Sequence, residues 1–236
     1  MCGPLLRKII KDSKKEEQDR GMCGEVLYDG VWYYENVLTL NRSRSLLGML
    51  LSLRYKHIEN PDKCRLQSQS YCLYGHAARV HKGSGTDEYM NTVCSEVMSR
   101  LDSSVLAIAG PNPTAVCARG LYSMPGCMCQ LCHQDCVGSI KRSKKYLSVL
   151  VSVQEHTTWW SCRLCELVSI RTCDVLVWRG DVGHGGGPYD KANWRFFFNI
   201  LPRAECEGMS TRARYSTERI SLYTCAHNRK VCIEGE

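Results

Sequence analysis

Residues 174–200 read DVLVWRGDVGHGGGPYDKANWRFFFNI, and in them two apolar runs flank a glycine-rich turn. Both runs have the short length and the valine and aromatic content of strands. The turn brings His184 beside three glycines, which removes side-chain bulk and suits the close approach of a ligand. Arg195 lies inside the second apolar run, where an unpaired guanidinium is costly. We therefore expect Arg195 to have an anionic partner, either a bound ligand or a protein carboxylate such as Asp181.

A second polar group, His133-Gln134-Asp135, lies upstream in a run that also has the character of a strand. Side chains alternate along a strand, so residues two apart face the same side, roughly 6.5–7 Å from each other. His133 and Asp135 can therefore converge on one metal ion, although a pattern this short is common by chance. His184 as a third ligand gives two histidines and one carboxylate, the usual site for non-haem Fe(II), which leaves coordination positions open.

The chain after residue 110 is dominated by short apolar runs with Gly, Pro, Ser and Lys clusters between them. Several short strands with no helical pattern between them predict an all-β sandwich or barrel. The predicted strands are 116–124, 128–137, 146–154, 166–170, 174–179 and 194–200.

The part of the chain before residue 110 predicts helices. Residues 46–55 suit a buried helix, and 86–101 has apolar residues every four positions with Thr86 as a candidate N-cap. We therefore expect a mainly helical extension, 1–110, that packs on a β-rich core, 111–236, with both parts in one integrated domain.

Composition and charge set limits on the function. The 236 residues suit one domain, and 23% charged with 44% hydrophobic residues is ordinary for a globular protein. No apolar run approaches the roughly 18 residues of a membrane span, and the first residues lack the core of a secretory signal, so we expect an intracellular protein. The cluster Lys141-Arg142-Ser143-Lys144-Lys145 could contact phosphate, but the net charge of +7 is mild and does not favour nucleic acid as a partner.

The sixteen cysteines allow a second interpretation. Without an export signal we expect them to be reduced and to pack as small hydrophobes. Cys129-x-x-Cys132 and Cys162-x-x-Cys165 have the spacing of a Zn(II) site, so the alternative is a cysteine-rich zinc module, structural or nucleic-acid-binding. Against it, Cys129 and Cys132 point to opposite faces if their segment is a strand.

Residues 125–202 resemble the catalytic core of the Fe(II)/2-oxoglutarate-dependent dioxygenases, including the jelly-roll relatives of phytanoyl hydroxylase and AlkB. Arg195 follows His184 by eleven positions, as the family pattern expects. The motifs that carry the resemblance, in the family's order, are Pro125-Gly126-Cys127 followed by His133 and Asp135, the run 146–154, the segment 177–184, and Asn193-x-Arg195.

The resemblance implies an α+β chain with a double-stranded β-helix (jelly-roll, cupin-like) core and N-terminal flanking helices. It implies that His133, Asp135 and His184 hold Fe(II), and that Arg195 grips the distal carboxylate of 2-oxoglutarate. The charges of Fe(II), Asp135, 2-oxoglutarate and Arg195 then sum to zero. O2 is the other co-substrate, and 2-oxoglutarate decarboxylation drives hydroxylation or demethylation of an unknown substrate. An inactive jelly-roll interaction protein is the alternative that keeps the fold and loses the iron.

Overall fold

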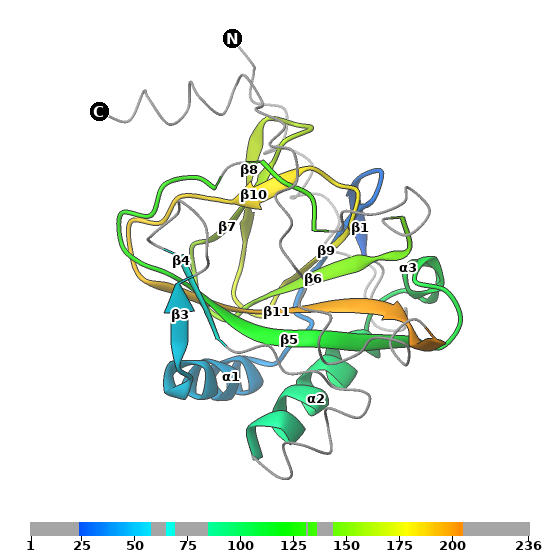
Figure 1. Ribbon diagram of the computed structural model, residues 1–236, viewed down its shortest axis with the longest axis horizontal. Coiled ribbons are helices and arrows are strands. Elements are labelled where there is room, and N and C mark those ends of the chain that lie inside the picture. Colours follow the sequence, from blue (N-terminus) through cyan, green and yellow to red (C-terminus); the bar gives the residue numbers. More distant parts are fainter. Residues whose placement is uncertain (1–23, 58–64, 69–84, 131, 136–143, 205–236) are drawn as a thin grey trace, which may run out of the picture.

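Two antiparallel sheets face each other in the computed structural model, and helices cover the outer side of the larger sheet (Figure 1). The structure describes residues 24–57, 65–68, 85–130, 132–135 and 144–204. The larger sheet has eight strands in the order β1-β2-β9-β6-β11-β5-β4-β3, and the smaller has three in the order β10-β7-β8. The strands are β1 (Glu25–Tyr28), β2 (Val31–Tyr34), β3 (Tyr55–His57), β4 (Arg65–Ser68), β5 (Pro113–Ser123), β6 (Leu147–Ser152), β7 (Thr157–Ser161), β8 (Glu166–Ile170), β9 (Val175–Arg179), β10 (His184–Gly186) and β11 (Asn193–Pro202). The helices are α1 (Leu40–Ser52), α2 (Gly85–Met98) and α3 (Ser103–Ile108).

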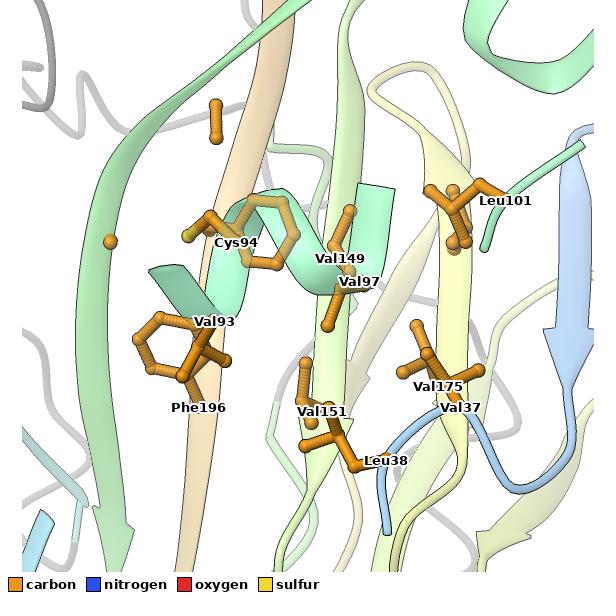
Figure 2. Packing of buried hydrophobic residues seen from close by; sticks show 14 of the residues in the cluster. Val37, Leu38, Val93, Cys94, Val97, Leu101, Val149, Val151, Val175 and Phe196 are labelled. Carbon is orange, nitrogen blue, oxygen red and sulfur yellow. The ribbon is translucent and has the colours of Figure 1, made fainter. Parts of the chain in front are cut away.

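The outer face of the larger sheet is covered by the helices. Figure 2 shows Val93 and Val97 of α2 packed across the central strands. There they join Val151 of β6, Val175 of β9 and Phe196 of β11, all of them buried. A sheet covered on both faces can carry apolar residues at successive positions, which explains the unbroken Phe196-Phe197-Phe198 run of β11.

The inner face of the larger sheet packs against the smaller sheet. Trp159 of β7 and Ile170 of β8 form one buried cluster with Leu150, Leu176 and Phe197 of the larger sheet. Because side chains alternate along a strand, the other inward-facing positions of β11 are two residues from Phe197 in each direction. They are Arg195 and Asn199, both buried.

The segment that carries the H-x-D motif lies alongside β10. Cys127 bridges Tyr189 and His133 bridges His184, both in antiparallel register. Between these two bridges the backbone N–H of Gln130 donates to the carbonyl of Gly186 at 2.8 Å. The segment therefore extends the smaller sheet on the side of β10. The predicted continuous strand over 128–137 is wrong in detail, because these contacts are isolated bridges, and residues 131, 136 and 137 lie outside the described part.

The double-stranded β-helix core is confirmed, and so are helices near 46–55 and 86–101 and the strands near 116–124, 146–154, 166–170, 174–179 and 194–200. The description of 1–110 as mainly helical omits β1 to β4, which join both edges of the larger sheet. These strands have only three or four residues each, too few for an alternating pattern to show. The division near residue 110 stays a prediction, and the side chain of Thr86 lies outside the described residues. In the described ranges no helix has both the length and the apolar character to cross a membrane.

Candidate metal centre

His133 and Asp135 come together with His184, the first residue of β10. Their ligand atoms all lie within 4.8 Å of one another. The backbones of His133 and His184 exchange two hydrogen bonds, of 2.8 and 2.9 Å, so the two histidines lie opposite each other on neighbouring chain segments. The structure therefore brings the three predicted residues together, and the pairing of the two segments places His184 beside His133.

The hydrogen bond at His184 determines its tautomer. Its Nδ1 is 2.9 Å from the carbonyl oxygen of Val182. A carbonyl oxygen only accepts, so Nδ1 carries the proton and Nε2 keeps its lone pair. Burial lowers the pKa of His184 to about 4, although Asp135 acts to raise it. Nε2 lies 3.5 Å from Oδ2 of Asp135, so at neutral pH two acceptors face each other, and a cation between them satisfies both.

Asp135 is ionised and held by the larger sheet. Its Oδ2 accepts hydrogen bonds from the hydroxyl of Ser148 on β6 and from the indole N–H of Trp178 on β9. Burial acts to raise the pKa of Asp135, but His184, His133, the Ser148 hydroxyl and Arg119 together lower it. The site thus offers a carboxylate and an unprotonated imidazole nitrogen, which is the donor chemistry that a divalent transition metal takes.

Two tryptophans enclose His184. Trp159 stacks on its ring at 5.7 Å between centroids with an interplanar angle of 13°, and the Trp178 ring lies 4.8 Å away. His184 is 4% exposed as a result. The aromatic surroundings shield this ligand from water and keep the site in a low-dielectric environment.

The three glycines after His184 have a different role from the predicted one. A Cβ on Gly185 would lie 2.6 Å from the carbonyl oxygen of Gln130, and one on Gly186 would overlap the guanidinium of Arg65. On Gly187 it would overlap the hydroxyl of Thr158. The glycines therefore allow other parts of the protein, rather than a ligand, to approach the backbone after the distal histidine.

Arg195 is buried on the inner face of β11. Its Nη1 donates to the hydroxyl of Ser123 at 2.9 Å, and its guanidinium lies 4.9 Å from the centroid of the Tyr189 ring. The alternative partner Asp181 instead pairs with Arg179 at 3.0 Å. Within the described ranges no carboxylate pairs with Arg195. Burial lowers its pKa, yet an arginine stays charged, so the site retains a buried cation that suits an anionic ligand.

Sequence reasoning missed a second buried arginine, Arg65 on β4. Arg65 is 2% exposed, and its Nη2 donates to the carbonyls of Met128 and Gly187, the latter at 2.9 Å. It thereby joins the H-x-D segment to the segment after His184. The short strand β4 gave no pattern, so no signal in the sequence pointed to this residue.

Cys132 and Cys162 form a disulfide with their Cα atoms 6.2 Å apart. The expectation that the cysteines are reduced is wrong for this pair, because the fold brings the two segments together. Neither residue then offers a thiolate to Zn(II), which argues against the zinc site predicted from the two Cys-x-x-Cys motifs. The His-Asp-His group is the only metal-ligand cluster that we find in the described residues.

Comparison with known proteins places the fold. No family model matches the chain, and neither does any curated protein. Among solved structures, HygX from Streptomyces hygroscopicus, with nickel and 2-oxoglutarate bound, is similar with a TM-score of 0.54 and 12% identity, over 74% of this chain and 83% of HygX. A Pseudomonas putida prolyl-4-hydroxylase has a TM-score of 0.52 and 10% identity, over 74% and 93%. A prolyl hydroxylase from Trichoplax adhaerens, in complex with a hypoxia inducible factor peptide, has a TM-score of 0.53 and 12% identity, over 75% and 86%.

The chain therefore has the double-stranded β-helix fold of the 2-oxoglutarate-dependent oxygenases, together with a His-Asp-His group suited to a metal. At these identities the likeness establishes the fold, and the chemistry depends on this chain's own residues.

Proposed function

We propose that this protein is an Fe(II)- and 2-oxoglutarate-dependent oxygenase that hydroxylates or demethylates a substrate. The observation that carries the proposal is the convergence of His133, Asp135 and His184, with an unprotonated Nε2 on His184 facing an ionised carboxylate at 3.5 Å. The nickel and 2-oxoglutarate in the similar structure of HygX support the same pair of ligands here.

These three residues would hold the metal on one face. Asp135 is oriented through Oδ2 by Ser148 and Trp178. The carbonyl of Val182 orients His184 through Nδ1. When bound, Fe(II) with 2-oxoglutarate and O2 supplies the oxidant, as 2-oxoglutarate is decarboxylated to succinate and CO2.

Arg195 would bind the distal carboxylate of 2-oxoglutarate. Ser148, which contacts Asp135, pairs in register with Asn199, and Ser152 pairs with Arg195. Four residues of strand span about 13 Å, which accommodates an arginine side chain and a five-carbon dicarboxylate end to end. The two-pronged guanidinium matches the planar carboxylate, and Ser123 and Tyr189 hold it in place.

The proposal is tested by anaerobic titration of the purified protein with Fe(II) and 2-oxoglutarate, following the weak visible charge-transfer band of the chelate. We expect a band only when both are present. His184→Asn should abolish it, and the matched control His156→Asn should not, because the His156 side chain is 77% exposed. Asparagine is suitable at position 156 because it tolerates the backbone φ of 65° there.

A second pair of variants tests the co-substrate site. Arg195→Met should weaken 2-oxoglutarate binding at least tenfold while Fe(II) still binds, and Arg44→Met, on the exposed side of α1, should leave both unchanged. If the wild-type protein shows no band and binds no iron, the proposal is wrong and the barrel serves a non-catalytic function. Zinc bound by the protein as purified, with its retention dependent on Cys162, would instead support the cysteine alternative.

A further inference from the structure

Arg119 of β5 is a third arginine directed into the barrel, besides Arg195 and Arg65. It pairs in register with Phe197 on β11, and Phe197 belongs to the cluster between the two sheets. The guanidinium carbon lies 4.9 Å from the centroid of the Phe197 ring. Arg119 therefore lies on the inner face of the larger sheet, the face that also carries Ser148 and Trp178, the two residues that hold Asp135.

The hydrogen bonds of Arg119 are incomplete. Its Nη1 donates to Oε1 of Gln67 over 3.4 Å, while its Nε is buried and has no acceptor. No carboxylate in the described ranges forms an ion pair with it. A buried N–H of a charged group that finds no partner costs more than an ordinary lost hydrogen bond. A ligand that supplies the missing acceptor would remove this cost.

The Phe197 ring connects Arg119 to the metal centre. The guanidinium carbon lies 4.9 Å from the centroid of this ring, and the ring of Trp178, whose N–H donates to Asp135, lies 6.0 Å from the same centroid. No hydrogen bond or ion pair joins Arg119 to Asp135, and Oδ2 of Asp135 already accepts from Ser148 and Trp178. Arg119 therefore lies near the site but does not orient Asp135, which is held by Ser148 and Trp178.

The charges around the metal centre indicate that Arg119 lacks an anionic partner among the described residues. Fe(II), Asp135, 2-oxoglutarate and Arg195 sum to zero, and the buried Arg65 donates to the backbone carbonyls of Met128 and Gly187. Arg119 adds a further positive charge, and its Nε has no acceptor in the described part of the chain. Because Gln67 contacts Nη1, the edge formed by Nε and Nη2 is left for a ligand. That edge presents two parallel N–H groups, the geometry that matches the two oxygens of a carboxylate.

We propose that Arg119 binds a carboxylate group of the primary substrate beside the metal centre, so that the enzyme acts on anionic rather than neutral molecules. This inference rests on the proposed function, because it assumes that 2-oxoglutarate and the metal occupy the sites formed by Arg195 and the His-Asp-His group. It makes Arg119 a specificity-determining residue for the substrate and gives it no part in holding the metal or the co-substrate.

The test uses matched probes on the intact protein loaded with Ni(II) and 2-oxoglutarate, which binds without turnover. Isothermal titration calorimetry compares hexanoate with hexanamide, and benzoate with benzamide. We expect each carboxylate to bind at least tenfold more tightly than its amide. Arg119→Gln should abolish this preference and Arg44→Gln should retain it, while the Fe(II)–2-oxoglutarate band stays the same in both variants.

Each other outcome overturns one part of the scheme. Equal affinity for carboxylate and amide, or a preference that survives Arg119→Gln, overturns the role of Arg119 and leaves the iron site intact. Loss of the chelate band in Arg119→Gln would also overturn it, because the residue would then belong to the co-substrate site. A wild-type protein with no band, but with Arg119-dependent binding of hexanoate, would overturn the oxygenase function and support the carboxylate site.

Discussion

The indole N–H of Trp178 donates to Oδ2 of Asp135 over 3.0 Å, and the Trp178 ring also lies against the ring of His184. One side chain of β9, a strand in the middle of the larger sheet, therefore positions two of the three candidate ligands. Partners of this kind fix the orientation of the ligands and strengthen metal binding. The metal centre is thus held by a residue that also belongs to the hydrophobic core between the two sheets.

Trp178→Phe should weaken metal binding about tenfold, because it removes the hydrogen bond to Asp135 and keeps an aromatic ring against His184. Titration of the metal-free protein with Ni(II), followed by calorimetry, measures the affinity. Trp194→Phe is the control, since Trp194 stacks on Tyr122 and packs with the outer core. Equal affinities for the two variants would show that the indole N–H does not support the site.

The stability of the metal-free protein should fall as the pH is lowered from about 6.5 to about 4. In the unfolded chain His184 has a pKa near 6.5, and burial lowers it to about 4 in the fold. Between these values the unfolded chain takes up a proton that the folded protein does not, so acid favours unfolding. The difference amounts to at most about 3 kcal/mol. The lowered pKa of Asp135 adds a further loss only at more acidic pH, below its ordinary value.

Urea unfolding at pH 7, 5.5 and 4 measures this effect. His184→Asn should flatten the dependence in that window, whereas His156→Asn should keep it, because His156 is exposed and has no comparable burial. A slope that is the same in both variants would assign the acid sensitivity to another group.

Part of the site could be predicted from the sequence. The apolar run around Arg195 indicates the strand that carries it. The grouping of His133, Asp135 and His184 followed from short motifs and the family resemblance, because the segment with His133 forms isolated bridges and not the predicted strand. Arg65 and Arg119 could not be found in this way. Their importance depends on which strands are neighbours, since β4 pairs with β5 and β5 with β11, and neighbours in a sheet are separated by unpredictable lengths of chain.

The disulfide and the glycines were misjudged for the same reason. Cys132 and Cys162 are 30 residues apart in sequence and meet only because β7 pairs with β10, next to the H-x-D segment. The glycines after His184 are explained by Gln130 and Arg65, which the fold brings against them from distant positions. The sequence shows where glycines lie, but only the tertiary structure shows which groups pack against them.

Arg65→Met should destabilise the protein by about 2–4 kcal/mol. The change leaves the carbonyls of Met128 and Gly187 without their charged donor in a buried place, and bonds to charged donors are each worth about 1.5–3 kcal/mol. Urea unfolding of the metal-free protein gives the free energy. Arg44→Met, on the exposed side of α1, controls for the loss of a positive charge and should change stability by less than about 0.5 kcal/mol. A similar small effect in both variants would mean that Arg65 is not a structural link.

Reduction of the disulfide should loosen the metal centre. Cys132 immediately precedes His133, and the N–H of Cys162 donates to the carbonyl of Gly183, the residue before His184. The bond thus closes a loop between the segments that carry the two histidines, and for a sequence separation of 30 it should stabilise the fold by about 3.6 kcal/mol.

Dithiothreitol should therefore lower both the free energy of unfolding and the Ni(II) affinity of the wild-type protein. The double variant Cys132→Ala/Cys162→Ala should already have the lower values and should not respond to dithiothreitol. If the reagent acts on the double variant as strongly as on the wild type, other cysteines cause the effect. If it acts on neither, the bond does not support the site, and the backbone pairing of His133 with His184 is sufficient to keep the two ligands together.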